Sequence, residues 1–335
     1  MKPSELTKAL THLIQQRRPG MVWGAPGIGK SDIMRQVAKN LELELRDVRL
    51  STMDVVDVRG FPVPDLEQQV MKWLTANFLP PMQVKGKPNK TRGVIFLDEL
   101  TSAVPAVQAA MYQLILDFRI GDYTLPSGWS IIAAGNRKSD RSVVHEMPAA
   151  LANRLIHLDA ESDADEWQAW AIKNGISGVT RGFLQFRPNL LHKFDPNARA
   201  WPSGRTWEFV DRNVRGHNLP SSLEFSLIAG AVGEGAATEY HAFAATAERV
   251  PKVADILSKP DTTPVPDDPS VLYATATLLD THVNPNTIAK ALIYIERMPS
   301  EFQALCLRGA VTANPDIENT QEYTDWLIKN ANLLR

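Results

Sequence analysis

Hydrophobic residues in the first half of the chain follow two alternating patterns. Helical spacing predicts a helix over residues 4–18, with Ser4 as its N-cap and Pro19 just after its end. Short segments rich in apolar residues predict five strands, at residues 21–23, 43–50, 93–98, 129–134 and 155–158. Strands of this kind, separated by helices, are typical of a parallel sheet covered on both faces. We therefore expect an α/β domain over residues 1–160, with a five-stranded parallel sheet flanked by helices.

Two segments interrupt this alternation of strands and helices, and the second half of the chain shows helical patterns without strands. Residues 52–81 are proline-rich and are interpreted as an insertion around a hairpin, while turn residues within 118–129 predict a second hairpin. Beyond Asp159, helix-starting residues precede helical patterns at residues 162–174, 203–214 and 221–232. We expect a helical domain over residues 161–335, containing a proline-rich, acidic loop or linker at residues 259–269.

The composition is that of an ordinary globular protein, and the net charge bears on which class of partner is favoured. Hydrophobic residues make up 44% and charged residues 22% of the 335, and the formal net charge of -2 does not favour nucleic acid as a partner. Arg137, Lys138 and Arg141 form a local basic patch, interpreted as a solvated loop or, alternatively, an intersubunit contact. Cys306 is the only cysteine, which fits a reducing compartment. Because no signal peptide or membrane-length apolar run is recognisable, we expect a cytoplasmic protein without membrane insertion.

A glycine-rich loop carries the strongest chemical signal. It lies between the first predicted strand and a predicted helix and matches the pattern Gly-x4-Gly-Lys-Ser, with the residues Gly24, Ala25, Pro26, Gly27, Ile28, Gly29, Lys30 and Ser31. In such a loop, backbone N–H groups surround phosphates, the lysine neutralises phosphate charge and the serine hydroxyl faces Mg²⁺. A chance glycine turn is the alternative, but the strand-loop-helix context favours binding of ATP.

A second motif supplies two adjacent carboxylates. Residues 94–97 are apolar and predict a buried strand that ends in Asp98 and Glu99. Asp98 is expected to hold Mg²⁺ through water, and Glu99 to orient and deprotonate the water that attacks ATP. Acidic residues are also common at helix starts, so a simple helix cap is the alternative for an isolated motif.

Three further polar residues are candidates for the same site. Asn136 follows the fourth predicted strand, where open α/β sheets bind ligands, and it could share the attacking water with Glu99. Arg154 precedes the fifth strand and Arg205 opens a helix of the second domain, and either guanidinium could reach a γ-phosphate. The alternatives are a turn-forming asparagine and two solvated surface arginines.

The order and spacing of these motifs resemble those of MoxR-type AAA+ ATPases, in the clade that includes the magnesium chelatase AAA+ subunits. The matching positions are Gly24 to Ser31 at Walker A, Val94 to Glu99 at Walker B, Asn136 at sensor 1, Arg154 at the arginine finger and Arg205 at sensor 2. The segment around Asp57 and Gly60 resembles the insertion in helix 2 of the family, and the hairpin near Gly121 its insertion before sensor 1.

The resemblance implies a P-loop NTPase of the AAA+ fold with an all-α lid and a helical C-terminal extension. It also implies Mg²⁺-dependent hydrolysis of ATP to ADP and phosphate in a ring, a hexamer, in which Arg154 contacts ATP held by the neighbouring subunit. Such rings remodel protein partners, often ones with a von Willebrand factor A domain. The alternatives are a motor acting on nucleic acid or in phage defence, which the near-neutral charge disfavours, and a slow or inactive scaffold, which Glu99 disfavours.

Overall fold

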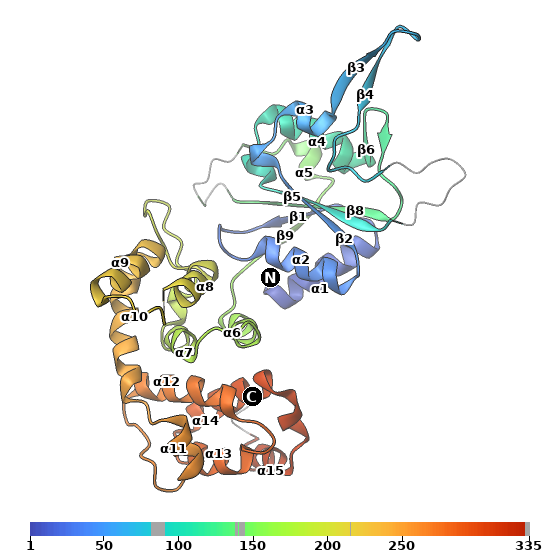
Figure 1. The fold of residues 1–335 in the computed structure, drawn as a ribbon. Coiled ribbons are helices and arrows are strands. Elements are labelled where there is room, and N and C mark those ends of the chain that lie inside the picture. Colours follow the sequence, from blue (N-terminus) through green and yellow to red (C-terminus); the bar gives the residue numbers. More distant parts are fainter. Residues whose placement is uncertain (82–90, 138–139, 141–144, 215, 332–335) are drawn as a thin grey trace. The chain divides into compact units, whose positions relative to one another are not determined.

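The computed structural model describes residues 1–81, 91–137, 140, 145–214 and 216–331 (Figure 1). The chain divides into two compact units, Met1–Glu161 and Ser162–Arg335. Two buried apolar clusters belong to each unit, so each has its own core. Among the described residues, no helix is both long and apolar enough to cross a membrane.

The first unit is built on a parallel sheet with the strand order β2-β5-β8-β1-β9. Its strands are β1 Gly20–Trp23, β2 Glu44–Arg49, β5 Gly93–Asp98, β8 Trp129–Gly135 and β9 Ile156–Asp159. Every pairing in this sheet is parallel, and β5 and β8 are buried along their whole length. Their continuous apolar runs reflect burial on both faces. The sheet confirms the predicted fold class, because all five expected strands are present and parallel.

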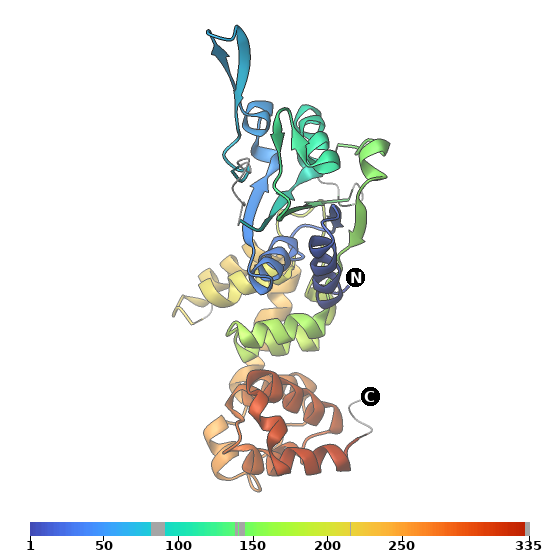
Figure 2. The same cartoon turned by 90° about the vertical axis from the view of Figure 1, so that its right-hand side faces the viewer.

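Helices cover both faces of this sheet, and the alternation of β5 shows which helix covers which face (Figures 1 and 2). Val94 and Phe96 pack in one cluster with α1 (Pro3–Gln15) and α2 (Lys30–Asn40). Ile95 and Leu97 point the other way, into a cluster with α4 (Pro105–Asp117). The short helices α3 (Val55–Arg59) and α5 (Ala149–Ala152) contribute Val58 and Leu151 to the α4 side.

The N-terminal helix differs from its prediction at both ends. Lys2 rather than Ser4 is the N-cap, because Pro3 occupies the first helical turn, where its missing N–H costs nothing. The helix ends at Gln15, and Arg17 adopts a left-handed backbone with φ of 52°. In this conformation the Arg17 guanidinium donates to the carbonyls of Trp129 at 3.0 Å, Leu125 at 3.0 Å and Pro126 at 3.2 Å. These bonds explain why the helix stops before residue 18.

Two hairpins lie outside the main sheet. One, β3 (Phe61–Asp65) with β4 (Val70–Leu74), falls within residues 52–81 and projects from the first unit (Figures 1 and 2). Gly60 fixes its base, because a Cβ there would lie 1.9 Å from the Leu74 carbonyl oxygen and φ is +90°. The other pairs β6 (Arg119–Ile120) with β7 (Tyr123–Thr124).

The described residues of the second unit form helices and loops, without a strand. Its helices are α6 Ala164–Lys173, α7 Gly178–Phe186, α8 Gly204–Asn213, α9 Ser221–Val232, α10 Glu234–Thr246, α11 Val253–Ser258, α12 Pro269–Leu279, α13 Ile288–Ile295, α14 Ser300–Ala313 and α15 Gln321–Lys329. The proline-rich segment 259–269 is a loop packed on this unit rather than a linker. The Tyr294 hydroxyl donates to the Pro264 carbonyl at 3.0 Å, and the Thr263 side chain is buried.

A buried ion pair ties α7 to the end of α12. Arg181 donates to the two carboxylate oxygens of Asp280 at 2.6 and 2.9 Å, and the side chains are only 1% and 3% exposed. Arg181 also donates to the carbonyls of Thr277 at 2.6 Å and Ile176 at 3.1 Å. Gly309 of α14 lies against the carboxylate, since a Cβ there would be 2.3 Å from Asp280 Oδ2.

The single cysteine lies deep in this second unit. Cys306, on α14, is buried and has no disulfide partner. Burial raises the pKa of its thiol well above the ordinary value, and the nearby charge of Asp280 adds to the effect. A thiol that stays protonated and inaccessible is chemically inert.

Candidate functional site

The glycine-rich loop joins the carboxyl end of β1 to the first residue of α2. Gly27 and Gly29 have φ of 81° and 96°, in the left-handed region that side chains rarely adopt. Gly24 is needed for another reason, because a Cβ there would lie 3.2 Å from Ile28 Cγ2 and 3.3 Å from Ala160 Cβ. The loop therefore turns tightly, and the amino end of α2 follows it at Lys30.

Lys30 is held by three oxygen atoms around its ammonium group. Its Nζ donates to the carbonyls of Gly24 at 2.6 Å and Ala25 at 3.2 Å, and to Oδ1 of Asn136 at 3.0 Å. Asn136 follows β8, the strand next to β1 in the sheet. The structure thus brings together the lysine and the asparagine that the sequence placed 106 residues apart. Oxygen atoms of a bound phosphate would compete for the same ammonium protons.

Ser31 and Asp98 form the second contact between motifs. The Ser31 hydroxyl donates to Asp98 Oδ2 at 2.9 Å, and the other carboxylate oxygen accepts from the Glu99 N–H at 2.9 Å. Asp98 is only 6% exposed, because it ends the buried strand β5. Burial, together with the charge of Asp98, raises the pKa of Asp47 on β2, while Arg35 and Arg49 oppose this shift.

The pair fits a magnesium ion held jointly with a nucleotide. A hydroxyl and a carboxylate are the hard oxygen ligands that Mg²⁺ prefers, and Mg²⁺ is commonly bound by one or two protein groups plus phosphates and water. Among the described residues, no group of three or more His, Cys, Asp or Glu side chains could hold a metal by itself. Ser31 and Asp98 would therefore hold Mg²⁺ only as part of a nucleotide complex.

Glu99 has a strained backbone and two partners that the sequence did not suggest. Its φ and ψ are 56° and 33°, a left-handed conformation that costs a non-glycine residue about 1 kcal/mol. Its carboxylate accepts a hydrogen bond from the Ser51 hydroxyl and lies 3.7 Å from Arg49 Nε. Both partners lie at the carboxyl end of β2, where Arg49 is in register with Asp98 of β5. The sequence signal for them was position alone, since Arg49 ends β2 and Ser51 follows it closely.

The remaining candidates, Arg154 and Arg205, lie on other elements of the chain. Arg154 is exposed, one residue before the apolar Leu155 that leads into β9 at the edge of the sheet. Arg205 is exposed in the first turn of α8 and belongs to the second unit. Arg137 pairs with Asp159, its Nη2 lying 2.6 Å from Oδ1, whereas Lys138 and Arg141 fall outside the described residues.

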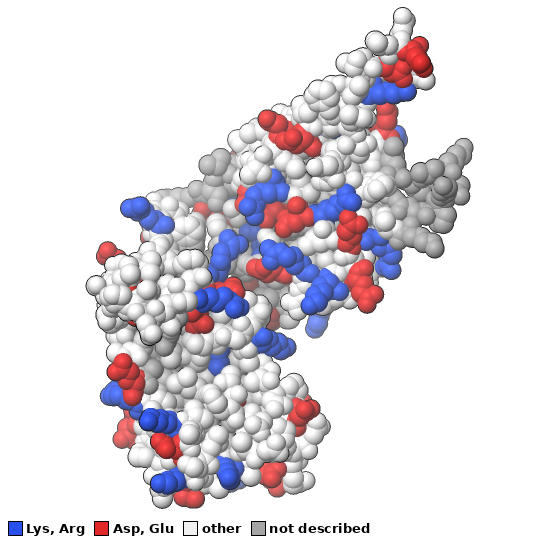
Figure 3. Space-filling model, viewed as in Figure 1, with Lys and Arg blue, Asp and Glu red and all other residues white. Residues whose placement is uncertain are grey.

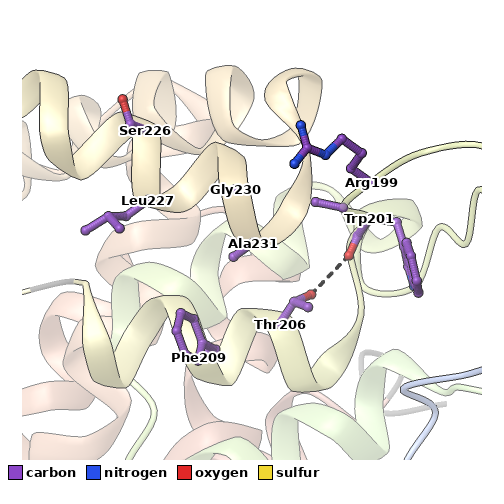
Figure 4. A pocket seen from close by; sticks show the side chains of 9 residues that line it. Arg199, Trp201, Thr206, Phe209, Ser226, Leu227, Gly230 and Ala231 are labelled. Atoms are coloured by element: carbon purple, nitrogen blue, oxygen red, sulfur yellow. Dashed lines mark hydrogen bonds between the residues drawn. The ribbon is translucent and has the colours of Figure 1, made fainter.

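The second unit also contains an apolar pocket of about 470 Å³ between α8 and α9 (Figure 4). Phe209 and Thr206 come from α8, Leu227 and Gly230 from α9, and Trp201 from the preceding loop. The Thr206 hydroxyl donates to the Trp201 carbonyl at 3.2 Å. Of the described residues that line it, Arg199 is the one that carries a charge.

Comparisons with known proteins cover the same residues. Residues 21–157 match the family described as ATPase family associated with various cellular activities (AAA). The match spans the phosphate loop, both carboxylates, Asn136 and Arg154, while Arg205 lies beyond it. Among curated proteins, none matches this chain.

The solved structures that match this chain are distant in sequence. NtrX from Brucella abortus, in complex with ADP, is 12% identical over 98% of this chain and 68% of its own, with a TM-score of 0.42. The RuvB Holliday junction branch migration motor of Thermotoga maritima is 16% identical over 97% of this chain and 85% of its own, with a TM-score of 0.35.

Proposed function

We propose that the chain, whose residues 21–157 match the AAA ATPase family, is a MoxR-type, Mg²⁺-dependent ATPase that assembles into a ring and remodels a protein partner. The observation that carries the proposal is the hydrogen-bonded network of Lys30, Ser31, Asp98 and Asn136 at the carboxyl ends of three strands. In open α/β sheets this edge is where ligands bind.

Each residue of the network has a task that its geometry supports. Lys30 would exchange its carbonyl partners for β- and γ-phosphate oxygens, and the loop N–H groups and the start of α2 would bind the remaining phosphate charge. Ser31 and Asp98 would hold Mg²⁺, which neutralises the charge that develops on the phosphates. Asn136 lies at hydrogen-bond distance from Lys30, and in the proposed mechanism its amide would help to orient the attacking water.

Glu99 is the proposed general base. Its carboxylate follows Asp98 directly and is 40% exposed, so it can accept a proton from a water molecule. Attack of that water on the γ-phosphorus breaks the bond to the β-phosphate oxygen, and ADP and phosphate leave. Ser51 and Arg49 position the carboxylate at the end of β2.

The ring, the client and the second unit extend the proposal beyond one site. Arg154 would contact ATP held by the neighbouring subunit, and Arg205 of the helical second unit would act as sensor 2 of a lid. Both side chains are exposed and therefore accessible to a nucleotide or another subunit. A protein with a von Willebrand factor A domain is the proposed client. On the face shown in Figure 3, basic and acidic side chains are interspersed over the described residues, which does not support a nucleic-acid track.

Two variants test the proposal. Glu99→Gln should lower the ATP turnover rate by about 10² to 10⁴-fold while ATP binding persists, because only the base is lost. Arg154→Ala should also be inactive alone. In a 1:1 mixture of the two variants, about a quarter of the interfaces in a randomly mixed ring combine an intact base with an intact arginine and should recover activity. Unchanged turnover in Glu99→Gln would reject the catalytic assignment, and no recovery on mixing would reject the shared site.

A further inference from the structure

The β3–β4 hairpin exposes an unusual amount of apolar surface. Six large apolar residues within or beside it are between 48% and 85% exposed: Phe61, Leu66, Val70, Met71, Trp73 and Leu74. Scattered exposed apolar residues are normal, but a cluster of them on one projecting element marks an interaction surface. In the part of the chain that the structure describes, β3 and β4 pair only with each other, so each strand has an outer edge.

Two prolines determine which outer edge can accept another strand. Pro62 faces Trp73 and Pro64 faces Met71 across the hairpin. Because proline has no N–H, these must be the non-hydrogen-bonded pairs, and the bonded pairs are Phe61 with Leu74, Val63 with Lys72 and Asp65 with Val70. The backbone groups of residues 62 and 64 therefore point outward on β3, and that edge has no N–H donor at either position.

The edge of β4 is chemically the opposite. Residues 71 and 73 also belong to non-hydrogen-bonded pairs, so their N–H and C=O groups point away from β3. Extended peptides add to edges of this kind, with main-chain hydrogen bonds for affinity and alternate side chains for specificity. One edge of the hairpin is thus closed to strand addition and the other is open.

The side chains beside the open edge form a wholly apolar face. Residues opposite each other in an antiparallel pair share a face, so Pro62, Pro64, Met71 and Trp73 lie together. Lys72 and Asp65 lie on the other face, where Nζ is 2.5 Å from Oδ2. Tryptophan supplies a large anchor, methionine adapts to different shapes and the prolines are rigid. Together they suit alternate apolar side chains of a bound strand.

Charge indicates what kind of strand this is. Residues 61–74 contain Asp65 and Glu67 against Lys72 alone, a formal charge of -1, and acidic side chains are visible at the hairpin tip in Figure 3. A second copy of this chain is a poor occupant, because the symmetric antiparallel pairing of two β4 strands places Lys72 opposite Lys72, and among the described residues each of these lysines has only its own Asp65 to offset the repulsion. A partner strand with a basic residue near the tip is favoured.

We propose that the outer edge of β4 binds an extended segment of the protein client by strand addition, with apolar residues at alternate positions and a basic residue beside the tip. This proposal rests on the remodelling function above, because it assigns the surface that first holds the client. The segment pairs with the backbone of Met71 and Trp73 and extends the apolar face.

The test uses the full chain and a fluorescein-labelled decapeptide in which valine alternates with threonine and two lysines stand at one end. Met71→Pro removes an outward N–H without removing a β3–β4 hydrogen bond, and Met71→Ala is its matched control, since both variants lose the same side chain. Fluorescence anisotropy should show that the affinity of Met71→Pro for the peptide is lower than that of Met71→Ala by about tenfold or more. A peptide with proline at the threonine positions should not bind, and one with glutamates for lysines should bind more weakly.

Equal affinity of the two Met71 variants, or undiminished binding of the proline peptide, would overturn the proposal. A change in sedimentation of Met71→Pro without a change in peptide affinity would also overturn it, because the edge would then serve another copy of the chain. ATP turnover without peptide is measured in parallel and should match the parent in both variants, which shows that they are folded. If the parent chain itself shows no ATP turnover, the proposed ATPase function is rejected, whatever the result with the peptide.

Discussion

Replacing Arg181 by methionine tests the internal support of the second unit. The substitution keeps most of the side-chain volume but leaves the Asp280 carboxylate, 3% exposed, without its two charge-assisted hydrogen bonds. Breaking a buried pair by removing one partner costs about 3–5 kcal/mol. For a unit of this size, about 1 kcal/mol shifts the melting temperature by roughly 2–4 °C, so we expect a decrease of about 6–20 °C.

The loss of stability in Arg181→Met should depend on pH in a definite direction. Burial raises the pKa of Asp280 above its ordinary value of 3.8, and Arg181 opposes that shift. A carboxyl whose folded pKa is raised is best tolerated below its unfolded pKa, and its contribution to stability is lost as the pH rises through the folded value. Without Arg181 the folded pKa rises further. The deficit of Arg181→Met should therefore be largest at neutral pH and shrink as the pH falls toward about 4.

Urea unfolding followed by far-ultraviolet circular dichroism at several pH values measures both effects. The control is the double variant Arg181→Met with Asp280→Leu, which removes the orphaned charge and should recover most of the lost stability, because apolar replacement of a buried pair is often neutral. A loss below about 1 kcal/mol for the single variant, or a loss independent of pH, would refute the idea that Arg181 compensates a buried carboxylate.

Two further predictions concern the site and one helix cap. Asn136→Ala should lower the ATP turnover rate with little change in ATP affinity. Asn136→Asp should weaken ATP binding, because a carboxylate 3.0 Å from Lys30 Nζ would compete with phosphate. Binding of a fluorescent ATP analogue to the two variants distinguishes these outcomes, and equal affinities would contradict the assignment. The Ser270 and Arg249 side chains lower the pKa of Asp268 to about 2, so its charge stabilises the fold above the unfolded pKa of 3.8 and ceases to as the pH falls through about 2. Asp268→Asn should accordingly be less stable than the parent at pH 6 and equal to it below pH 2, as measured by thermal unfolding, and a constant difference would contradict the linkage.

The sheet was predictable because its signals are local. The central strand β5 is buried on both faces, which makes its apolar run continuous, so residues 93–98 could be assigned without knowledge of their neighbours. The phosphate loop was predictable for the same reason. Gly27 and Gly29 adopt positive φ angles, and the glycines that allow this conformation are recognisable in the local sequence alone. Strand order was not local, and the sequence could not show that β2 lies beside β5.

The contacts that could not be predicted from the sequence depend on how distant segments come together in the fold. Ser51 and Arg49 contact Glu99 only because β2 ends beside β5, and the left-handed backbone of Glu99 turns its carboxylate toward them. Arg181 and Asp280 lie 99 residues apart, and neither is distinguished locally from a surface charge. The two faces of the β3–β4 hairpin follow from its register, which a proline-rich sequence does not reveal by alternation alone.

The burial of Cys306 makes this protein convenient for spectroscopy. Because the only native thiol is enclosed and stays protonated, maleimide reagents should leave it unmodified in the folded chain. Two cysteines introduced on exposed helix positions would then be the sole labelling positions, with no native residue to remove first. A donor dye on α1 and an acceptor dye on α15 could therefore report, in single molecules, the distance between the two units at each stage of ATP turnover.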